Sequence, residues 1–295
     1  MSNPKPTAPA VPPVAAPAVV MPVDTSGQLP AVVPPPPPDF SDAAGSGFEG
    51  AGREDMAIPF LSVLQGLSPE VKRSEGAYIE GAFEGMVFNT VTKEAIDTSV
   101  NRLVVIPCAY HRAFVEWRVR EAGGGFVAEH PSTTPLQTQT TRDDRGRDIL
   151  PNGNQLNDTR TFYVMVVDET QVTVSPAVIT MTSTQIKKAK QWLMQQNLLK
   201  LRGPGGAYTP PMFASRWVVA TVPESNQKGT WYGWKFEHDG YLAGPADPMY
   251  LAAREFYQSV AAGKVRADLT KTAPAPAKVN PDTGEPMPGE DDIPF

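Results

Sequence analysis

Proline placement limits which part of this chain can fold. The first 50 residues are mostly Pro, Ala, Val, Gly and Ser, with an unbroken proline run over residues 34–38. They lack the aromatic and β-branched periodicity that builds a core. A second Pro/Ala/Lys-rich segment follows Val265. We therefore expect a disordered, partly polyproline arm over residues 1–54, a folded domain over residues 55–264, and a disordered linker with an acidic tip over residues 265–295.

Strand signals dominate the middle of the chain. Short apolar or alternating runs are separated by glycine-rich turns, and residues 130–160 are polar enough to be expected as a mobile loop. The runs predicted to be strands are residues 58–65, 86–88, 101–107, 109–120, 161–168, 172–180, 216–222 and 230–236. This pattern predicts one β-rich α+β domain with about two helices.

Two segments carry helix signals. The first starts at Thr182, where Thr182 and Gln185 have the spacing of a capping box, and ends at the glycines of residues 203–206. The second opens with Asp247 as N-cap and Pro248 at the first helical position, and extends to about Ala262.

Membrane, disulfide and catalytic signals are absent from the sequence. It has no run of 18 apolar residues, and prolines interrupt any signal-peptide helix near its start, so we expect a soluble cytoplasmic protein. The single cysteine, Cys108, lies beside an apolar run and is expected in the core; strand alternation would point it away from His111. We find no metal-ligand or nucleotide-loop motif and expect neither enzymatic activity nor a cofactor.

Charge is divided unevenly along the chain. The net charge is −6, yet residues 101–266 carry +5 while residues 1–100 carry −7 and residues 267–295 carry −4. A basic centre between acidic ends suits a body that meets phosphate groups, because attraction depends on the charge close to the strand.

The strand over residues 109–120 carries the first candidate DNA-binding surface. Alternation places His111, Ala113, Val115, Trp117 and Val119 on a presumed core face. The opposite face combines aromatic rings with arginines: Tyr110, Arg112, Phe114, Arg118 and Arg120, with Glu116 among them. Rings stack on exposed bases and guanidinium groups pair with phosphates, so this face predicts binding of single-stranded DNA; a solvated sheet face is the alternative.

Two further segments extend this prediction. Alternation over residues 231–236 puts Tyr232, Trp234 and Phe236 on one side, leaving Trp231 and Lys235 on the other as the better candidates for DNA contact. The first helix carries Lys187, Lys188 and Lys190, which form either a wet helix face or the border of a groove for the DNA backbone. An alternative is that this basic run binds the chain's own acidic tip.

The last six residues are a recognisable peptide ligand: Glu290, Asp291, Asp292, Ile293, Pro294 and Phe295. Acidic groups suit a basic pocket, proline restricts the free conformations, and the phenylalanine ring is an apolar anchor. This order resembles the C-terminal tip of bacterial single-stranded DNA-binding proteins. The segments Ile58-Pro59-Phe60-Leu61 and Glu116-Trp117-Arg118 are similar to bacteriophage-encoded proteins of the same class.

The resemblance implies an enlarged OB-like barrel that binds and protects single-stranded DNA in replication, recombination and repair. It also implies that the tip recruits replication and recombination proteins. Assembly into a homo-oligomer, and location in a bacterial host cell, would agree with it. Two alternatives stay open: a recombination mediator that anneals complementary strands, and a phage structural or virion protein whose proline-rich arm docks on partners.

Overall fold

The computed structural model describes residues 41–43, 46–47, 49–50, 58–226 and 229–272. The chain divides into two units, Met1–Glu49 and Gly50–Phe295, and in the first the described structure is a short 3-10 helix, Ser41–Ala43. Most of the expected arm and the whole acidic tip lie outside the described residues. The second unit contains the sheet and both α-helices.

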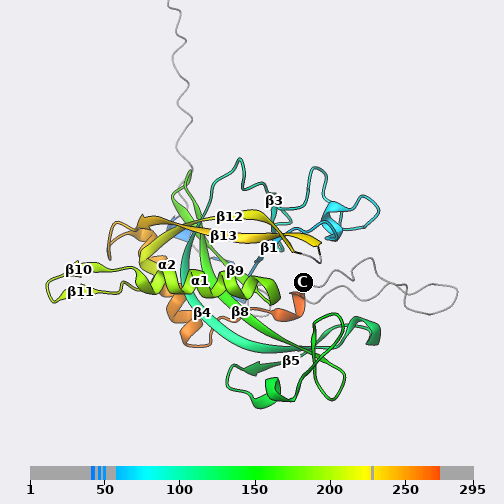
Figure 1. The fold of residues 1–295 in the computed structure, drawn as a ribbon. Coiled ribbons are helices and arrows are strands. Elements are labelled where there is room, and N and C mark those ends of the chain that lie inside the picture. The colour runs from blue at the N-terminus through cyan, green and yellow to red at the C-terminus, as the bar shows by residue number, and fades with distance from the viewer. Residues whose placement is uncertain (1–40, 44–45, 48, 51–57, 227–228, 273–295) are drawn as a thin grey trace, which may run out of the picture. The chain divides into compact units, whose positions relative to one another are not determined.

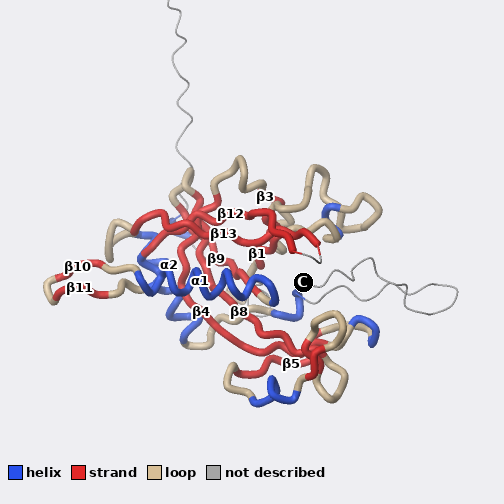
Figure 2. Tube along the Cα trace, viewed as in Figure 1, coloured by secondary structure: helices blue, strands red, loops and turns tan. Residues whose placement is uncertain are grey.

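The second unit is a β-rich α+β fold, and the predicted fold class is confirmed (Figures 1 and 2). Its two α-helices are α1 (Ile186–Leu198) and α2 (Pro248–Ala261). Its strands are β1 (Phe60–Val63), β2 (Val87–Asn89), β3 (Ala95–Ile96), β4 (Leu103–Trp117), β5 (Phe126–Pro131), β6 (Thr141–Arg142), β7 (Asp148–Ile149), β8 (Gln155–Asp168), β9 (Thr173–Met181), β10 (Leu201–Gly203), β11 (Gly206–Tyr208), β12 (Ser215–Asn226) and β13 (Gly229–Tyr241). No helix in the described part of the chain has the length and apolar character to cross a bilayer.

One sheet holds eleven of the described strands. Its main path runs β13-β12-β4-β8-β9-β1-β2-β3, with β5 added to β4 and the short strands β6 and β7 beside β8. All its strand pairs are antiparallel except β1 with β9. The other two strands, β10 and β11, form a separate hairpin directly after α1 (Figure 1).

The two ends of the sheet approach one another, which curls it into a barrel-like shape. The side chain of Gln65, just after β1, hydrogen-bonds the backbone of Tyr232 in β13. Near this contact, Thr221 Oγ1 in β12 donates to the carbonyl of Gly85 at 2.5 Å. Side chains therefore bridge strands that have no direct ladder between them.

The largest apolar cluster fills the inside of this curl. It joins residues of β1, β2, β4, β8, β9, β12 and β13 to α1. Trp192 of α1 lies parallel to Phe236 with ring centroids 3.8 Å apart, and its ring also contacts Phe162 and Trp217. Burial of Trp234 in the same cluster confirms that this side of β13 belongs to the core. The other helix, α2, packs on the opposite face of the sheet against a second cluster around Cys108 and Ile106.

The long strand β4 departs from the expected pair of strands. It runs without a break through Cys108, where a register shift between Pro107 and Ala109 forms a β-bulge against β8. A bulge residue has no partner and reverses the alternation that follows it. The break predicted after Pro107 is therefore wrong, because the bulge absorbs the change of pattern within one strand.

Residues 130–160 are more ordered than a loop. They include the end of β5, a 3-10 helix (Pro135–Gln139), β6, β7 and the first residues of β8. Leu150 and Leu156 bury their side chains against Phe114, so this arm has a small core of its own. The prediction of a mobile loop is wrong because polar composition concealed these apolar contacts.

The two helix starts gave opposite outcomes. Asp247 caps α2 as predicted, with its carboxylate accepting from the Met249 N–H at 2.8 Å and Pro248 following as the first helical residue. The capping box at Thr182 and Gln185 does not form. Instead, Gln185 accepts a hydrogen bond from the backbone N–H of Trp234, so its side chain fixes the end of α1 to β13.

Candidate nucleic-acid interface

The predicted face of β4 is largely engaged in contacts within the protein. Arg112 forms two hydrogen bonds to the carboxylate of Asp158, at 3.0 and 2.9 Å. The hydroxyl of Tyr110 accepts a hydrogen bond from Arg160 at 2.9 Å, and Arg160 also pairs with Asp158. Burial alone would raise the pKa of Asp158, but hydrogen bonds from Arg112 and Arg160 lower it below its usual value. The two guanidinium groups share one carboxylate, so their charge is offset only in part.

Phe114 occupies a buried position. Its side chain is 5% exposed and packs with Leu150 and Leu156. A ring so enclosed cannot stack on a base, and the prediction that Phe114 faces the DNA is wrong. Farther along, Arg118 is exposed, while Arg120 begins a 3-10 helix, Arg120–Ala122. The strand therefore lacks the continuous aromatic and basic surface that alternation indicated.

Glu116 on the same face is held by three neighbours. Its carboxylate accepts from Asn152 at 2.9 Å and from Asn154 at 2.6 Å, and lies 2.8 Å from the His130 ring nitrogen Nε2. Burial by itself would raise the pKa of Glu116, but these hydrogen bonds lower it. The group joins β4 to β5 and to the turn before β8, and so has a structural role.

The outward side of β13 exposes Lys235, as predicted, but leaves Trp231 only partly accessible. Lys235 is exposed and pairs with Glu237 at 2.7 Å. Trp231 is half-buried, and its indole N–H donates to Glu224 at 3.0 Å. The other carboxylate oxygen of Glu224 lies 2.6 Å from Lys188 Nζ. This contact brings α1, β12 and β13 together and neutralises one of the three predicted helix lysines.

The remaining helix lysines lie on an open basic surface. Lys187 and Lys190 are exposed on α1, and the same side of the helix continues with two exposed apolar side chains, Met194 (58%) and Leu198 (66%). The helical spacings of three and four residues align them in a row. Within the described residues, no carboxylate forms an ion pair with Lys187 or Lys190.

The β10–β11 hairpin extends this surface. It projects from the end of α1 in Figure 1 and carries exposed Lys200 just before it, Arg202 within it, and Tyr208 at its end, with 48% of the tyrosine exposed. We call the exposed set Lys187, Lys190, Met194, Leu198, Lys200, Arg202 and Tyr208 the α1–hairpin surface. Residues 170–223 contain no Asp or Glu, so the segment that forms it carries only positive charges.

The hairpin half of this surface was not predicted from the sequence. The glycines of residues 203–206 indicated a helix end, and they form instead the turn between two short strands. The acid-free stretch was the available signal. It indicates a basic surface but does not show that the hairpin also exposes Tyr208.

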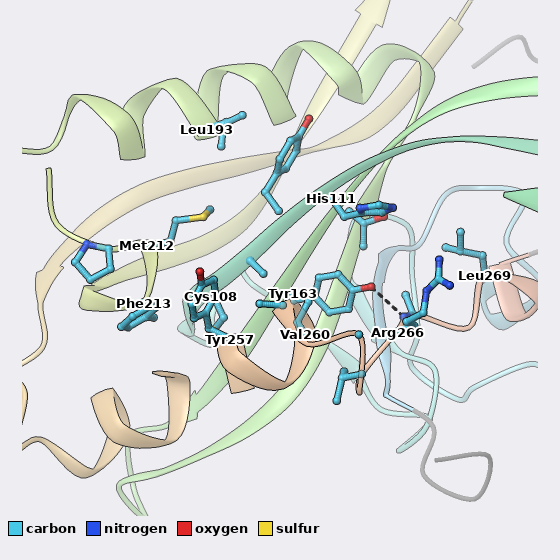
Figure 3. Close-up of a pocket in the computed structure, with 18 of the residues that line it drawn as sticks. Cys108, His111, Tyr163, Leu193, Met212, Phe213, Tyr257, Val260, Arg266 and Leu269 are labelled. Carbon is cyan, nitrogen blue, oxygen red and sulfur yellow. Dashed lines mark hydrogen bonds between the residues drawn. The ribbon is translucent and has the colours of Figure 1, made fainter. Parts of the chain in front are cut away.

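A cavity of about 930 Å³ lies beside β4 and is lined by residues of both helices, among them Leu193 of α1 and Tyr257 of α2 (Figure 3). Both Cys108 and His111 line it, so the expectation that they point apart is wrong; the bulge at Cys108 places them on one side. Cys108 is 1% exposed, and burial raises the pKa of its thiol well above the ordinary range. The described residues contain no group of metal-ligating side chains.

Comparison with known proteins identifies one relationship. The family model described as "Pam3 phage gp34-like protein" matches residues 26–266, which is most of the chain. No curated protein matches the sequence. No solved structure matches it either. The chain therefore belongs to the Pam3 phage gp34-like family, which is named after a bacteriophage protein.

Proposed function

We propose that this protein binds single-stranded DNA without sequence preference, and that the α1–hairpin surface makes the main contact. The observation that carries the proposal is an acid-free segment that exposes three lysines, an arginine and a tyrosine ring. Cations along a surface attract the phosphate backbone, and an aromatic ring stacks on any base. Neither contact depends on sequence.

The arrangement suits an extended strand. Lys187 and Lys190 lie toward one end of α1, while Lys200 and Arg202 lie beyond the other end. Met194 and Leu198 are exposed between these two pairs and offer apolar contact to unstacked bases. A strand laid along α1 would meet phosphate-binding groups at both ends. Tyr208 lies on the same hairpin as Arg202 but on its other face, opposite Leu201.

Trp231 and Lys235 belong to the proposal as secondary contacts. Lys188 and Glu224 join Trp231 to α1, so this part of β13 adjoins the start of the helix. Glu224 would repel phosphate at this point. We therefore expect DNA to make its stronger contacts toward the hairpin.

The acidic tip, residues 290–295, is proposed to recruit replication, recombination or repair proteins. This part rests on residue order alone: two aspartates before Ile293, Pro294 and Phe295. Its test is binding of a fluorescent peptide with this sequence to a candidate partner. A peptide with Phe295→Ala should bind at least about tenfold more weakly, because the apolar anchor is lost.

The DNA proposal is tested by removing charge from its surface. A variant with Lys187→Ser, Lys190→Ser and Arg202→Ser should bind a fluorescent oligothymidine much more weakly in anisotropy titrations at low salt. Arg254→Ser is the control for each of the three substitutions made singly, because it removes one charge on α2, away from this surface. Equal affinity of the triple variant and the control, with both proteins folded, would refute this site.

A separate variant tests stacking. Tyr208→Ala should weaken binding by about 1–3 kcal/mol, while Tyr208→Phe should keep most of the affinity because the ring remains. Loss with both substitutions would assign the effect to the hydroxyl instead. Addition of a complementary strand in the same assay distinguishes simple binding from annealing. Absence of any salt-sensitive binding would favour the virion-protein alternative.

A further inference from the structure

A second, smaller cavity lies at the end of α1, between the helix and the segment that follows the β10–β11 hairpin. Its volume is about 140 Å³, and its lining includes Gln196 and Leu199 from the helix end and Thr209, Met212 and Ser215 from the later segment. One water molecule needs only about 10–15 Å³ of such space, whereas sites for whole small molecules occupy about 300–1,000 Å³. The cavity therefore suits one small group of a larger ligand.

Gln196 is the unusual residue of this cavity. It lies on the buried side of α1, with 5% of its surface exposed. Among the residues that the structure describes, none forms a hydrogen bond with its carboxamide oxygen Oε1 or nitrogen Nε2. The indole N–H of Trp192, one turn earlier, is likewise unpartnered but does not line the cavity. Because buried polar groups in proteins nearly always have partners, the Gln196 amide points to a polar group that enters the cavity.

The rest of the lining is apolar or neutral. Leu199 and Met212 contribute apolar side chains, and the described residues that line the cavity include no Asp, Glu, Lys or Arg. The hydroxyl of Ser215 is already engaged, since it donates to the Met212 carbonyl at 3.2 Å and accepts from the Trp217 indole N–H at 3.0 Å. The Gln196 amide is thus the buried side-chain group left to recognise an occupant.

A cation lies at the rim of the cavity. Lys200 Nζ donates to the carbonyl of Asn197 at 3.3 Å and to the hydroxyl of Thr209, and both of these residues line the cavity. The two acceptors are neutral, and no carboxylate in the part of the chain that the structure describes forms an ion pair with Lys200. Its positive charge is therefore available to a phosphate group. Lys200 also belongs to the α1–hairpin surface.

We propose that this cavity binds one unpaired base of a DNA strand whose backbone follows the α1–hairpin surface. The inference rests on the proposed function and assigns a base-binding site within that surface. The Gln196 carboxamide carries an acceptor and a donor side by side, which match an adjacent donor and acceptor on the Watson–Crick edge of a base. The apolar walls would contact the ring, and Lys200 would meet a neighbouring phosphate.

Such a site selects single-stranded over double-stranded DNA. In a duplex the Watson–Crick edges are paired, whereas an unpaired base can turn out of the stack and enter a pocket. Each of the four bases has a donor beside an acceptor on this edge, so the Gln196 contact is compatible with binding that does not depend on sequence. The carboxamide is enclosed by its neighbours, and the broad last torsion of glutamine lets it turn toward the base.

The test uses fluorescent oligothymidine and a matched strand in which every thymine is methylated at N3. Methylation removes the N3–H donor of the Watson–Crick edge and keeps the ring and the phosphates. Anisotropy titrations at one salt concentration compare the full-length wild type with Gln196→Met and Gln258→Met. Methionine is similar to glutamine in length but has no amide. Gln258 is the matched control, because it is exposed on α2 and lines neither cavity.

We expect the wild type and Gln258→Met to bind oligothymidine at least about fivefold more tightly than the methylated strand, because methylation leaves the Gln196 amide without its partner. Gln196→Met should bind the two strands equally, since the group that recognises the edge is gone. Thermal unfolding checks that both variants are folded.

Three results would overturn the base site. Equal binding of the two strands by the wild type would do so and would leave the proposed DNA-binding function in place. Discrimination by Gln196→Met as strong as that of the wild type would have the same meaning and would assign the cavity to water alone. Absence of any binding to oligothymidine would overturn both the base site and the proposed function.

Discussion

The side-chain amide of Gln65 hydrogen-bonds both backbone groups of Tyr232, with Nε2 donating to the carbonyl and Oε1 accepting from the N–H, each at 2.9 Å. The amide thereby acts as a one-residue strand partner for β13. Gly85 lies beneath the Tyr232 ring with φ +90°, and a Cβ there would come within 2.6 Å of the ring. Close contact between two segments distant in sequence keeps the sheet curled.

Gln65→Leu should lower the free energy of unfolding by about 1–3 kcal/mol, because it leaves two backbone groups of β13 without these partners. Urea unfolding followed by tryptophan fluorescence measures the change. The matched control is Gln258→Leu, an exposed position on α2, which should change stability by less than about 0.5 kcal/mol. Equal effects of the two substitutions would show that the Gln65 bridge contributes nothing to closure.

Phe114→Ala should destabilise the protein by about 3–5 kcal/mol, since it empties the small core that it shares with Leu150 and Leu156. Folded Phe114→Ala protein should bind oligothymidine with wild-type affinity. Denaturant unfolding and anisotropy titration on the same preparation separate the two effects. Weakened DNA binding without a loss of stability would return Phe114 to the interface.

Acid should destabilise the protein in part through Glu116. The folded-state pKa of this carboxyl is lower than its ordinary value of 4.5, so its contribution is present above that value and is lost as pH falls through the folded pKa. Urea unfolding between about pH 3 and pH 7 should therefore show stability declining at the acidic end. Glu116→Gln should flatten this decline. An unchanged pH profile in the variant would contradict the role assigned to the Asn152, Asn154 and His130 contacts.

Glu224→Gln should tighten single-stranded DNA binding. The substitution removes the carboxylate charge that Lys188 meets at 2.6 Å and leaves that lysine available to phosphate. One additional phosphate contact would steepen the slope of log K against log salt by about 0.7. Glu237→Gln, which releases Lys235 in a similar way farther along β13, is the comparison. An unchanged slope for Glu224→Gln would exclude the start of α1 from the DNA path.

Local signals predicted the elements better than their assembly. The Asp247 and Pro248 pair located the start of α2 because capping depends on adjacent residues. Strand alternation gave the correct division of faces after Ala109, yet the bulge at Cys108 and the burial of Phe114 depend on β8 and on Leu150 and Leu156, which are distant in sequence. Charge counting located the basic segment, but whether a lysine is free or paired, as with Lys190 and Lys188, is decided by where Glu224 lies.

The central claim is preferential binding of single-stranded DNA through exposed cations and a stacking ring. Anisotropy titrations of the wild-type protein with matched single- and double-stranded oligonucleotides, over a range of salt concentrations, test it most directly. We predict tighter binding of the single strand, with a slope of log K against log salt of about −3, from contributions of about −0.7 for each of Lys187, Lys190, Lys200 and Arg202. Equal affinity for the two forms, or affinity that does not change with salt, would contradict the proposed function.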